Sequence, residues 1–132
     1  MITLDTSALI AILLGEASKP RLIELTKGQE LIAPQSLQWE LANAFSAKFK
    51  RNPQTLSLEE AKEALDIYKL IPIRFVDTDL ARAVEMAYEL GIYAYDAFML
   101  ATTERYQAPL LSLDIRCTAL AKELKLPVLE VL

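Results

Sequence analysis

The chain has 132 residues, of which 53 % are hydrophobic, with 18 acidic and 14 basic side chains and a formal net charge of −4. This length and hydrophobic content predict one folded domain over residues 1–132 and exclude a disordered chain. The sequence contains no histidine, which excludes Ser-His-Asp and Cys-His catalysis and histidine-ligated metal sites. The acidic balance argues against simple electrostatic binding of nucleic acid.

The sequence also indicates a compartment. The longest apolar run, Ala8–Leu14, is far shorter than the roughly 20 residues that span a membrane. No basic leader precedes it, so we expect neither a signal peptide nor a membrane anchor. The single cysteine, Cys117, has no partner for an internal disulfide, and we expect it to be a buried thiol in a helix. These features predict a cytoplasmic protein.

The first residues predict a strand, an acid and a helix in succession. Ile2–Leu4 has the apolar character of a short buried strand, and Ala8–Leu14 that of a buried helix. Asp5 follows the strand directly, where open parallel sheets bind ligands. Asp5 is therefore either a ligand-binding acid or only the cap of the helix. In the first case Thr6 and Ser7 are expected to cap the helix.

Strands and helices alternate along the rest of the chain, as in proteins with a parallel sheet covered on both faces. We therefore predict a single three-layer α/β domain with Ile2–Leu4 as a central strand. The other predicted strands are Glu30–Ala33, Ile73–Val76, Pro109–Leu113 and Val128–Val131. The other predicted helices are Lys19–Lys27, Leu37–Lys50, Ser57–Leu70, Asp79–Leu90, Tyr95–Tyr106 and Ile115–Lys125.

Local signals mark several helix ends. Ser57 and Glu60 have the spacing of a capping box, in which each side chain bonds the backbone of the other. Asp77 is placed to cap the helix that follows the third strand. Gly28 and Gly91 are expected to end their helices.

Four acids are predicted to meet at one edge of the sheet. Asp5 and Asp114 follow apolar strands directly, and Asp96 lies in the first turn of a helix. Right-handed crossovers bring strand ends and the starts of the following helices to the same edge. Glu40 can point to this edge from its own helix, beside Asn43. For each acid alone, the alternative is a helix cap, a first-turn acid or a solvated residue.

Four close carboxylates without a histidine or a nearby lysine cannot all stay ionised, so either some hold protons or a cation neutralises them. Oxygen ligands alone favour Mg²⁺ or Mn²⁺ over Zn²⁺. Setting these four acids aside leaves 14 acidic against 14 basic residues, which removes the charge objection to a polyanionic substrate. Neutral hydrogen-bonding groups lie close to the acids in the sequence: Thr6, Ser7, Asn43 and Ser112.

Four motifs in order carry a family resemblance. They are LDTSALI at Leu4–Ile10, E-x-x-N at Glu40–Asn43, YDAFMLATT at Tyr95–Thr103 and LLSLD at Leu110–Asp114. The sequence resembles the PIN-domain family, and most closely its small VapC-type toxins of toxin–antitoxin pairs. One mild departure is Ser112, where the family more often has Thr, but the hydroxyl is kept.

The resemblance implies a PIN-like fold and a Mg²⁺-dependent endoribonuclease, with Mn²⁺ as an alternative ion. By motif, Asp5 and Asp96 would be the firmest metal ligands, Asp114 the next acid, and Glu40 a residue that helps to hold metal or water. Catalysis would rest on these four acids. Four neutral residues would contact the substrate or steady the ligands: Thr6, Ser7, Asn43 and, supporting Asp114, Ser112.

The resemblance also implies an RNA substrate, a cognate antitoxin protein and a homodimer, for which the helix of residues 57–71 is a candidate surface. Cations at the end of the Leu37–Lys50 helix either hold RNA phosphates or favour the helix dipole: Lys48, Lys50 and Arg51. Three further arginines are unranked candidates for phosphate contacts: Arg82, Arg105 and Arg116. Aromatic residues are assigned to the core, with an antitoxin groove as the alternative: Trp39, Phe45 and Phe49.

Two other functions compete with this one. A PIN-like module could bind RNA or protein without cutting, although the presence of all four acids argues against it. A phosphatase could use Asp5 as its nucleophile, but such enzymes commonly carry a second acid two residues on, where this chain has Ser7.

Overall fold

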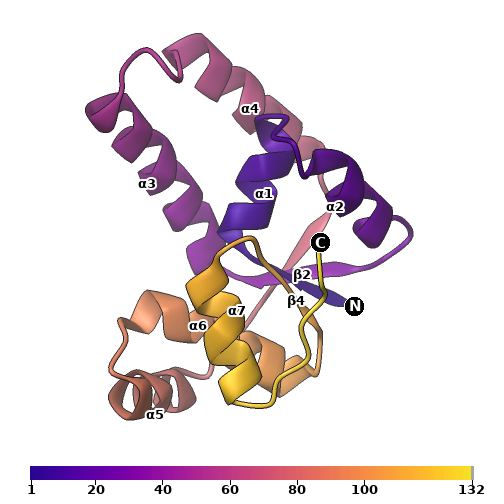
Figure 1. Cartoon of the computed structure of the whole chain (residues 1–132), viewed down its shortest axis with the longest axis vertical. Helices are drawn as coiled ribbons and strands as arrows, with labels where there is room; N and C mark the ends of the chain where they lie inside the picture. Colours follow the sequence, from indigo (N-terminus) through magenta and orange to yellow (C-terminus); the bar gives the residue numbers. More distant parts are fainter. Residues whose placement is uncertain (132) are drawn as a thin grey trace.

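A computed structural model describes residues 1–131. Its centre is a four-stranded, all-parallel sheet with the strand order β3-β2-β1-β4 (Figure 1). The strands are β1 (Ile2–Leu4), β2 (Leu31–Pro34), β3 (Ile73–Val76) and β4 (Leu110–Leu111). The predicted α/β class, parallel sheet and inner position of β1 are confirmed.

Seven helices are described: α1 (Thr6–Leu13), α2 (Lys19–Thr26), α3 (Ser36–Arg51), α4 (Leu58–Leu70), α5 (Leu80–Leu90), α6 (Ala94–Tyr106) and α7 (Ile115–Glu123). In Figure 1, α1–α4 lie above the sheet and α5–α7 below it. The sheet is thus covered on both faces, which explains why the strands are almost wholly apolar. Each predicted helix agrees with the structure to within two residues at either end.

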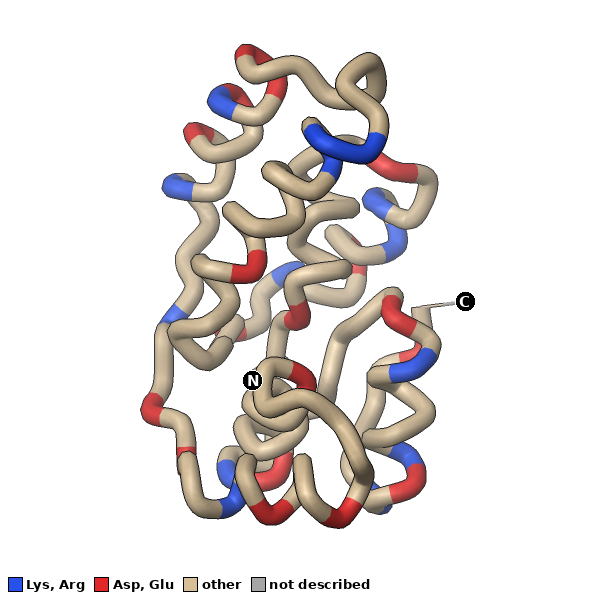
Figure 2. Tube along the Cα trace, turned by 90° about the vertical axis from the view of Figure 1, so that its left-hand side faces the viewer, with Lys and Arg blue, Asp and Glu red and all other residues tan. Residues whose placement is uncertain are grey.

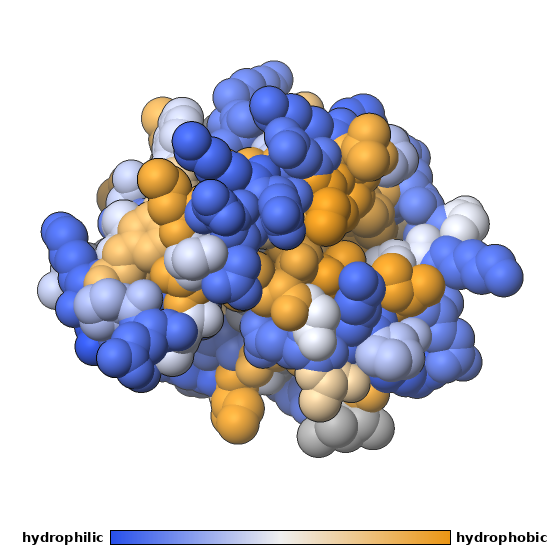
Figure 3. Space-filling model, turned by 90° about the horizontal axis from the view of Figure 1, so that it is seen from above, coloured by the Kyte–Doolittle hydropathy of each residue, from blue (hydrophilic) through white to orange (hydrophobic). Residues whose placement is uncertain are grey.

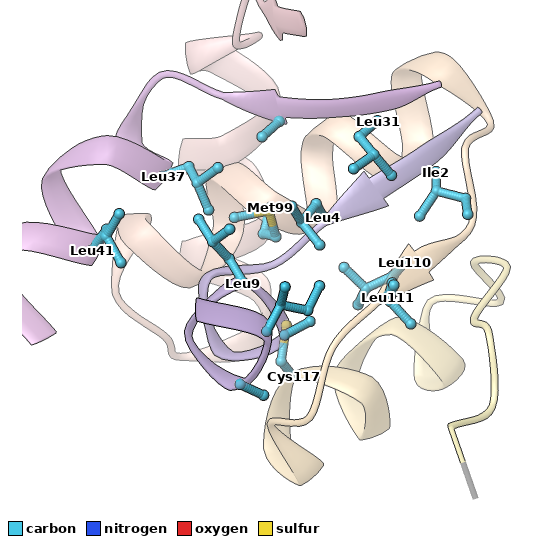
Figure 4. Close-up of a cluster of buried hydrophobic side chains, with 14 of the residues drawn as sticks. Ile2, Leu4, Leu9, Leu31, Leu37, Leu41, Met99, Leu110, Leu111 and Cys117 are labelled. Carbon is cyan, nitrogen blue, oxygen red and sulfur yellow. The ribbon is translucent and has the colours of Figure 1, made fainter. Parts of the chain in front are cut away.

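The core forms where β1 and β4 meet the flanking helices (Figure 4). Leu4, Leu9, Met99, Leu110 and Leu111 are all almost completely buried. Each such side chain contributes about 1.5–3 kcal/mol to folding when it is removed from water. The carboxyl ends of β1 and β4 are therefore firmly positioned, and this fixes where the residues that follow them lie.

Three helix-end predictions are confirmed and one is wrong. Gly28, with a left-handed φ of 73°, directly follows the C-cap of α2. Ser57 and Glu60 form the predicted capping box at the start of α4, and Gly91 ends α5 with a left-handed φ of 64°. Asp77 does not cap α5. Asp79 occupies the N-cap instead, and its Oδ1 accepts from the backbone N–H of Arg82 at 3.0 Å. The cap must lie three residues before the N–H that it accepts from, and only Asp79 does so.

The end of the chain is less regular than predicted. The expected strand Val128–Val131 is wrong: Val128 forms only an isolated parallel bridge with Leu110. β4 is two residues long rather than five, because the chain after Leu111 turns to engage Ser7 and to start α7. Among residues 1–131, no helix has the length and apolar character to cross a membrane.

Candidate functional site

Asp5 anchors the site at the carboxyl end of β1. Its backbone N–H donates to the carbonyl of Leu111 at 3.0 Å, which holds the ends of β1 and β4 side by side. Two serine hydroxyls donate to Oδ2 of its carboxylate, Ser7 Oγ at 2.7 Å and Ser112 Oγ at 2.6 Å. The Asp5 carboxylate is therefore fixed in orientation, and within residues 1–131 its Oδ1 accepts no hydrogen bond.

The two serines are held in turn by the chain that follows β4. The N–H of Leu113 donates to Ser7 Oγ at 2.9 Å, and the N–H of Asp114 donates to Ser112 Oγ at 3.0 Å. Ser112 thus contacts the backbone of Asp114 and the carboxylate of Asp5. The two serines link three segments of the site into one network.

The prediction that Thr6 and Ser7 cap α1 is wrong. Asp5 occupies the N-cap position, and its side chain makes no capping hydrogen bond. Thr6 and Ser7 donate their hydroxyls to carboxylates instead, Thr6 to Glu40 and Ser7 to Asp5. A hydrogen bond to a carboxylate is stronger than one between neutral groups, so both hydroxyls bond carboxylates rather than the backbone of α1.

Glu40 reaches the site from the first half of α3. Thr6 Oγ1 donates to its Oε2 at 2.6 Å, which leaves Oε1 free among the described residues. The pKa of Glu40 is raised from 4.5 to about 7, mainly by burial and to a smaller extent by the negative charges of Asp5 and Asp96, while the Thr6 hydrogen bond opposes the rise. Glu40 is therefore able to hold or release a proton near neutral pH.

Asp96 and Asp114 complete the group. Asp96 is half-buried in the first turn of α6, where burial raises its pKa, as do the charges of Asp114 and Asp5, while Arg116 opposes the rise. The guanidinium Nη1 of Arg116 lies 3.9 Å from Asp96 Oδ2. Asp114 caps α7, its Oδ1 accepting from the N–H groups of Arg116 (3.0 Å) and Cys117 (3.2 Å), and its Oδ2 accepts none within residues 1–131.

The four acids lie in one region of the molecule, but they do not converge on a single point. All of them act on the buried thiol of Cys117, whose pKa is raised first by burial and then by their charges. Figure 2 shows acidic segments in the middle of the trace, between the α3–α4 end and the α5 end. Yet no three acidic or thiol side chains of residues 1–131 are close enough together to hold a metal ion as placed. Like charges repel, and Asp96 is drawn to Arg116 while Asp114 is drawn to its cap.

A cavity of about 430 Å³ opens beside the acids, lined by Trp39, Glu40, Asn43 and Tyr95. Asn43, predicted from its spacing to Glu40, therefore does lie at the site. The assignment of Trp39 to the core is wrong, because 59 % of its surface is exposed. Phe45 is buried and Phe49 is partly buried, so these two aromatics do belong to the core.

The structure shows which of the candidate phosphate-binding cations already have partners within the protein. Arg82 is engaged by Glu104 at 2.7 Å and by Glu85 at 3.1 Å, and the Arg105 guanidinium lies over the ring of Tyr106. A second cavity of about 340 Å³ lies farther along α3, lined in part by Lys48 and Arg51. Within residues 1–131 neither of these two makes an ion pair.

Sequence reasoning missed three features of the site. It ranked Arg116 no higher than other arginines, and it did not place Trp39 or Tyr95 at the cavity. A signal was present for both aromatics, since each directly precedes a site acid, Glu40 or Asp96. A residue next to a site residue on a helix often lies on the rim of the same site.

Comparison with known proteins agrees with this geometry. The chain is similar in structure to PAE2754 from Pyrobaculum aerophilum, a crystal structure, with a TM-score of 0.64 and 20 % sequence identity over 98 % of this chain and 90 % of that one. This likeness shows the fold. No curated protein matched the chain. The PIN domain family matches residues 2–123, a span that contains all four acids. The chain therefore belongs to the PIN domain family, whose fold is generally found in nucleases that depend on divalent metal ions.

Proposed function

We propose that this protein is a Mg²⁺-dependent endoribonuclease, the toxin component of a type II toxin–antitoxin system, which hydrolyses RNA phosphodiester bonds at a carboxylate-held metal site. One observation carries the proposal. Asp5, Glu40 and Asp114 each have one oxygen held by hydrogen bonds and the other free among the described residues. Asp96 accepts no hydrogen bond there and meets only the guanidinium of Arg116.

The donor chemistry fits a hard divalent cation. The free ligands are all carboxylate oxygens, the set that Mg²⁺ and Mn²⁺ prefer. Burial raises the pKa values of Glu40 and Asp96 most, and the charges of neighbouring carboxylates, which a cation would offset, raise them further. Asp5, Asp96 and Asp114 would hold the ion.

Each residue then has a role. When bound, the cation would lower the pKa of a coordinated water and stabilise charge on the scissile phosphate. Glu40 would take the proton of the attacking water at Oε1, because Thr6 occupies Oε2. Ser7 and Ser112 would keep Asp5 oriented, and Asn43 would contact the substrate.

Lys48 and Arg51 would hold RNA phosphates that lead away from the acids. Both lie in the last turns of α3, and at a rise of about 1.5 Å per residue they are about 12 and 16 Å along the helix from Glu40. Their cavity would receive a phosphate group, because no carboxylate among the described residues neutralises them.

The remaining parts of the proposal concern context. We propose that residues 1–132 form one domain, act in the cytoplasm and are inhibited by a cognate antitoxin. We also propose a homodimer through α4, whose Leu58, Ile67 and Leu70 are 60 %, 44 % and 82 % exposed. Figure 3 shows apolar surface between hydrophilic margins at the α3–α4 end of the molecule. Leu70→Asp should then convert a dimer to a monomer in light scattering; an unchanged mass would contradict this surface.

Chelation and one substitution test the nuclease. Purified protein should cut RNA with Mg²⁺ or Mn²⁺, stop in EDTA, and recover when the ion is restored. Asp96→Asn should abolish cleavage and leave the circular dichroism spectrum unchanged. Asp66→Asn, at an exposed carboxylate of α4, is the matched control and should cut normally. Activity that persists in EDTA or in Asp96→Asn would refute the metal site.

The alternative is a PIN-like module that binds RNA or protein without cutting. The observation that favours it is the absence, among residues 1–131, of three side chains already gathered to hold a metal ion. It predicts RNA or protein binding that EDTA does not change, and no cleavage by the wild-type protein with either ion.

A further inference from the structure

The 430 Å³ cavity has two aromatic walls and no cation among its lining residues. Trp39 comes from α3 and Tyr95 from α6, each one residue before a site acid. Their exposed fractions are 59 % and 52 %, which is unusual for such large side chains next to a polar site. The ring of Tyr95 packs edge-on against Phe98, with centroids 5.7 Å apart, and this contact restricts its orientation.

The cavity also offers polar groups that no part of the described chain uses. The side-chain amide of Asn43 makes no hydrogen bond within residues 1–131, and neither does the indole N–H of Trp39. An amide presents a donor and an acceptor side by side, the pattern that reads the edge of a base. The volume is at the small end of ligand pockets, which suits one flat ring system.

We propose that this cavity binds one unstacked nucleobase of single-stranded RNA, between or against Trp39 and Tyr95, with Asn43 on the base edge. The proposal rests on the proposed nuclease function and adds to it a subsite for one base beside the acids. Single-stranded RNA is recognised by just this combination of aromatic stacking and contacts to base edges.

Charge decides which part of the nucleotide enters. Glu40 lines the cavity and the carboxylates of Asp5 and Asp96 lie near enough to act on it, so a phosphate there would be repelled. An uncharged base has no such penalty. Lys48 and Arg51, which make no ion pair within residues 1–131, lie farther along α3, where the backbone of the RNA can run. The cavity thus takes the base while the phosphates lie outside it.

The chain provides its own probe, because Trp39 is its only tryptophan. Short oligoadenylate and oligouridylate, added in EDTA to prevent cutting, should quench the Trp39 fluorescence as a base stacks on the indole. An abasic ribose-phosphate oligomer of the same length is the matched ligand, and it should bind through its phosphates without quenching. Equal quenching by the abasic oligomer, or none by either base-bearing oligomer, would overturn the proposal.

Substitutions supply a second readout by anisotropy of labelled oligomers. Trp39→Ala should weaken binding of base-bearing oligomers about 5- to 150-fold, the usual worth of one stacked base. Trp39→Phe should keep most of it, since a flat ring remains. Tyr95→Leu should weaken binding, whereas Tyr88→Leu, at an 89 % exposed tyrosine of α5, should not.

The two proposals fail in different ways. If the wild type cuts RNA while Trp39→Ala binds and cuts RNA as well as wild type, the base site is wrong and the aromatic walls belong to a protein partner. If base-bearing oligomers quench Trp39 but the wild type cuts no RNA with Mg²⁺ or Mn²⁺, the base site stands and the nuclease is refuted.

Discussion

Glu40→Gln should stabilise the metal-free protein above neutral pH. The Glu40 carboxyl has a pKa of 4.5 when exposed and about 7 in the folded chain. The folded state therefore binds this proton more tightly than the unfolded chain does. The contribution to stability is complete below pH 4.5, declines as the pH rises towards 7, and is lost above it. Glutamine cannot ionise, and it can still accept the Thr6 hydrogen bond.

The size of the effect follows from the same values. At about 1.4 kcal/mol per pKa unit the cost of ionising folded Glu40 reaches about 3 kcal/mol. Glu40 is only partly buried, so solvent screening reduces the cost to about 2 kcal/mol. This figure is the expected excess stability of Glu40→Gln above pH 7, and the excess should vanish below pH 4.5.

Urea denaturation in EDTA, followed by circular dichroism across this pH range, measures the difference. Glu63→Gln, at an exposed carboxylate of α4, is the control and should show no pH-dependent gain. Mg²⁺ should shrink the difference between wild type and Glu40→Gln, because a bound cation offsets the charges of Asp5 and Asp96. The reasoning is refuted if Glu40→Gln is less stable than wild type above pH 7, or if the difference does not depend on pH.

Three further substitutions test other parts of the site. Ser112→Ala removes a buried donor to Asp5 and should cost about 2 kcal/mol in urea unfolding; a loss near zero would mean that water replaces the hydroxyl. Arg116→Gln removes the cation beside Asp96 and should tighten Mn²⁺ binding a few-fold in calorimetry, whereas weaker binding would make Arg116 a support of the metal site. Arg51→Gln should weaken RNA binding and lower the slope of log affinity against log salt by about 1; an unchanged slope would exclude a phosphate contact.

The positions of the acids could be predicted because they depend on topology. Once β1 and β4 are recognised as parallel strands, the residues that follow them must lie at one edge, and Asp5 and Ser112 do. Asp96, in the first turn of α6, also lies near enough to Glu40 to raise its pKa, but α6 is the second helix between β3 and β4, so the crossover rule does not fix where it starts. Apolar patterning and caps were enough to place these elements to within two residues.

What could not be predicted depends on competition between local partners. Thr6 has the side chain of a good helix cap, but a carboxylate from a helix 34 positions away is a better acceptor. Asp114 could either bind a ligand or cap the helix that follows it, and one of its oxygens caps the helix. Trp39 is apolar, yet it faces outward, because the buried face of α3 is already filled by Leu37, Leu41 and Phe45. These three outcomes can be predicted only when the residues that surround each side chain in three dimensions are known.

The charge distribution couples metal binding to RNA binding. The net charge of −4 equals the charge of the four site acids, because the other acidic and basic residues balance. Without a cation these carboxylates repel the phosphates of an approaching strand, and with one bound the repulsion is relieved. RNA should therefore bind more tightly in Mg²⁺ than in EDTA. By linkage, RNA should tighten Mg²⁺ binding by the same factor. Equal RNA affinity with and without the ion would mean that the strand does not reach the carboxylates, and the acids would then lie outside the RNA path.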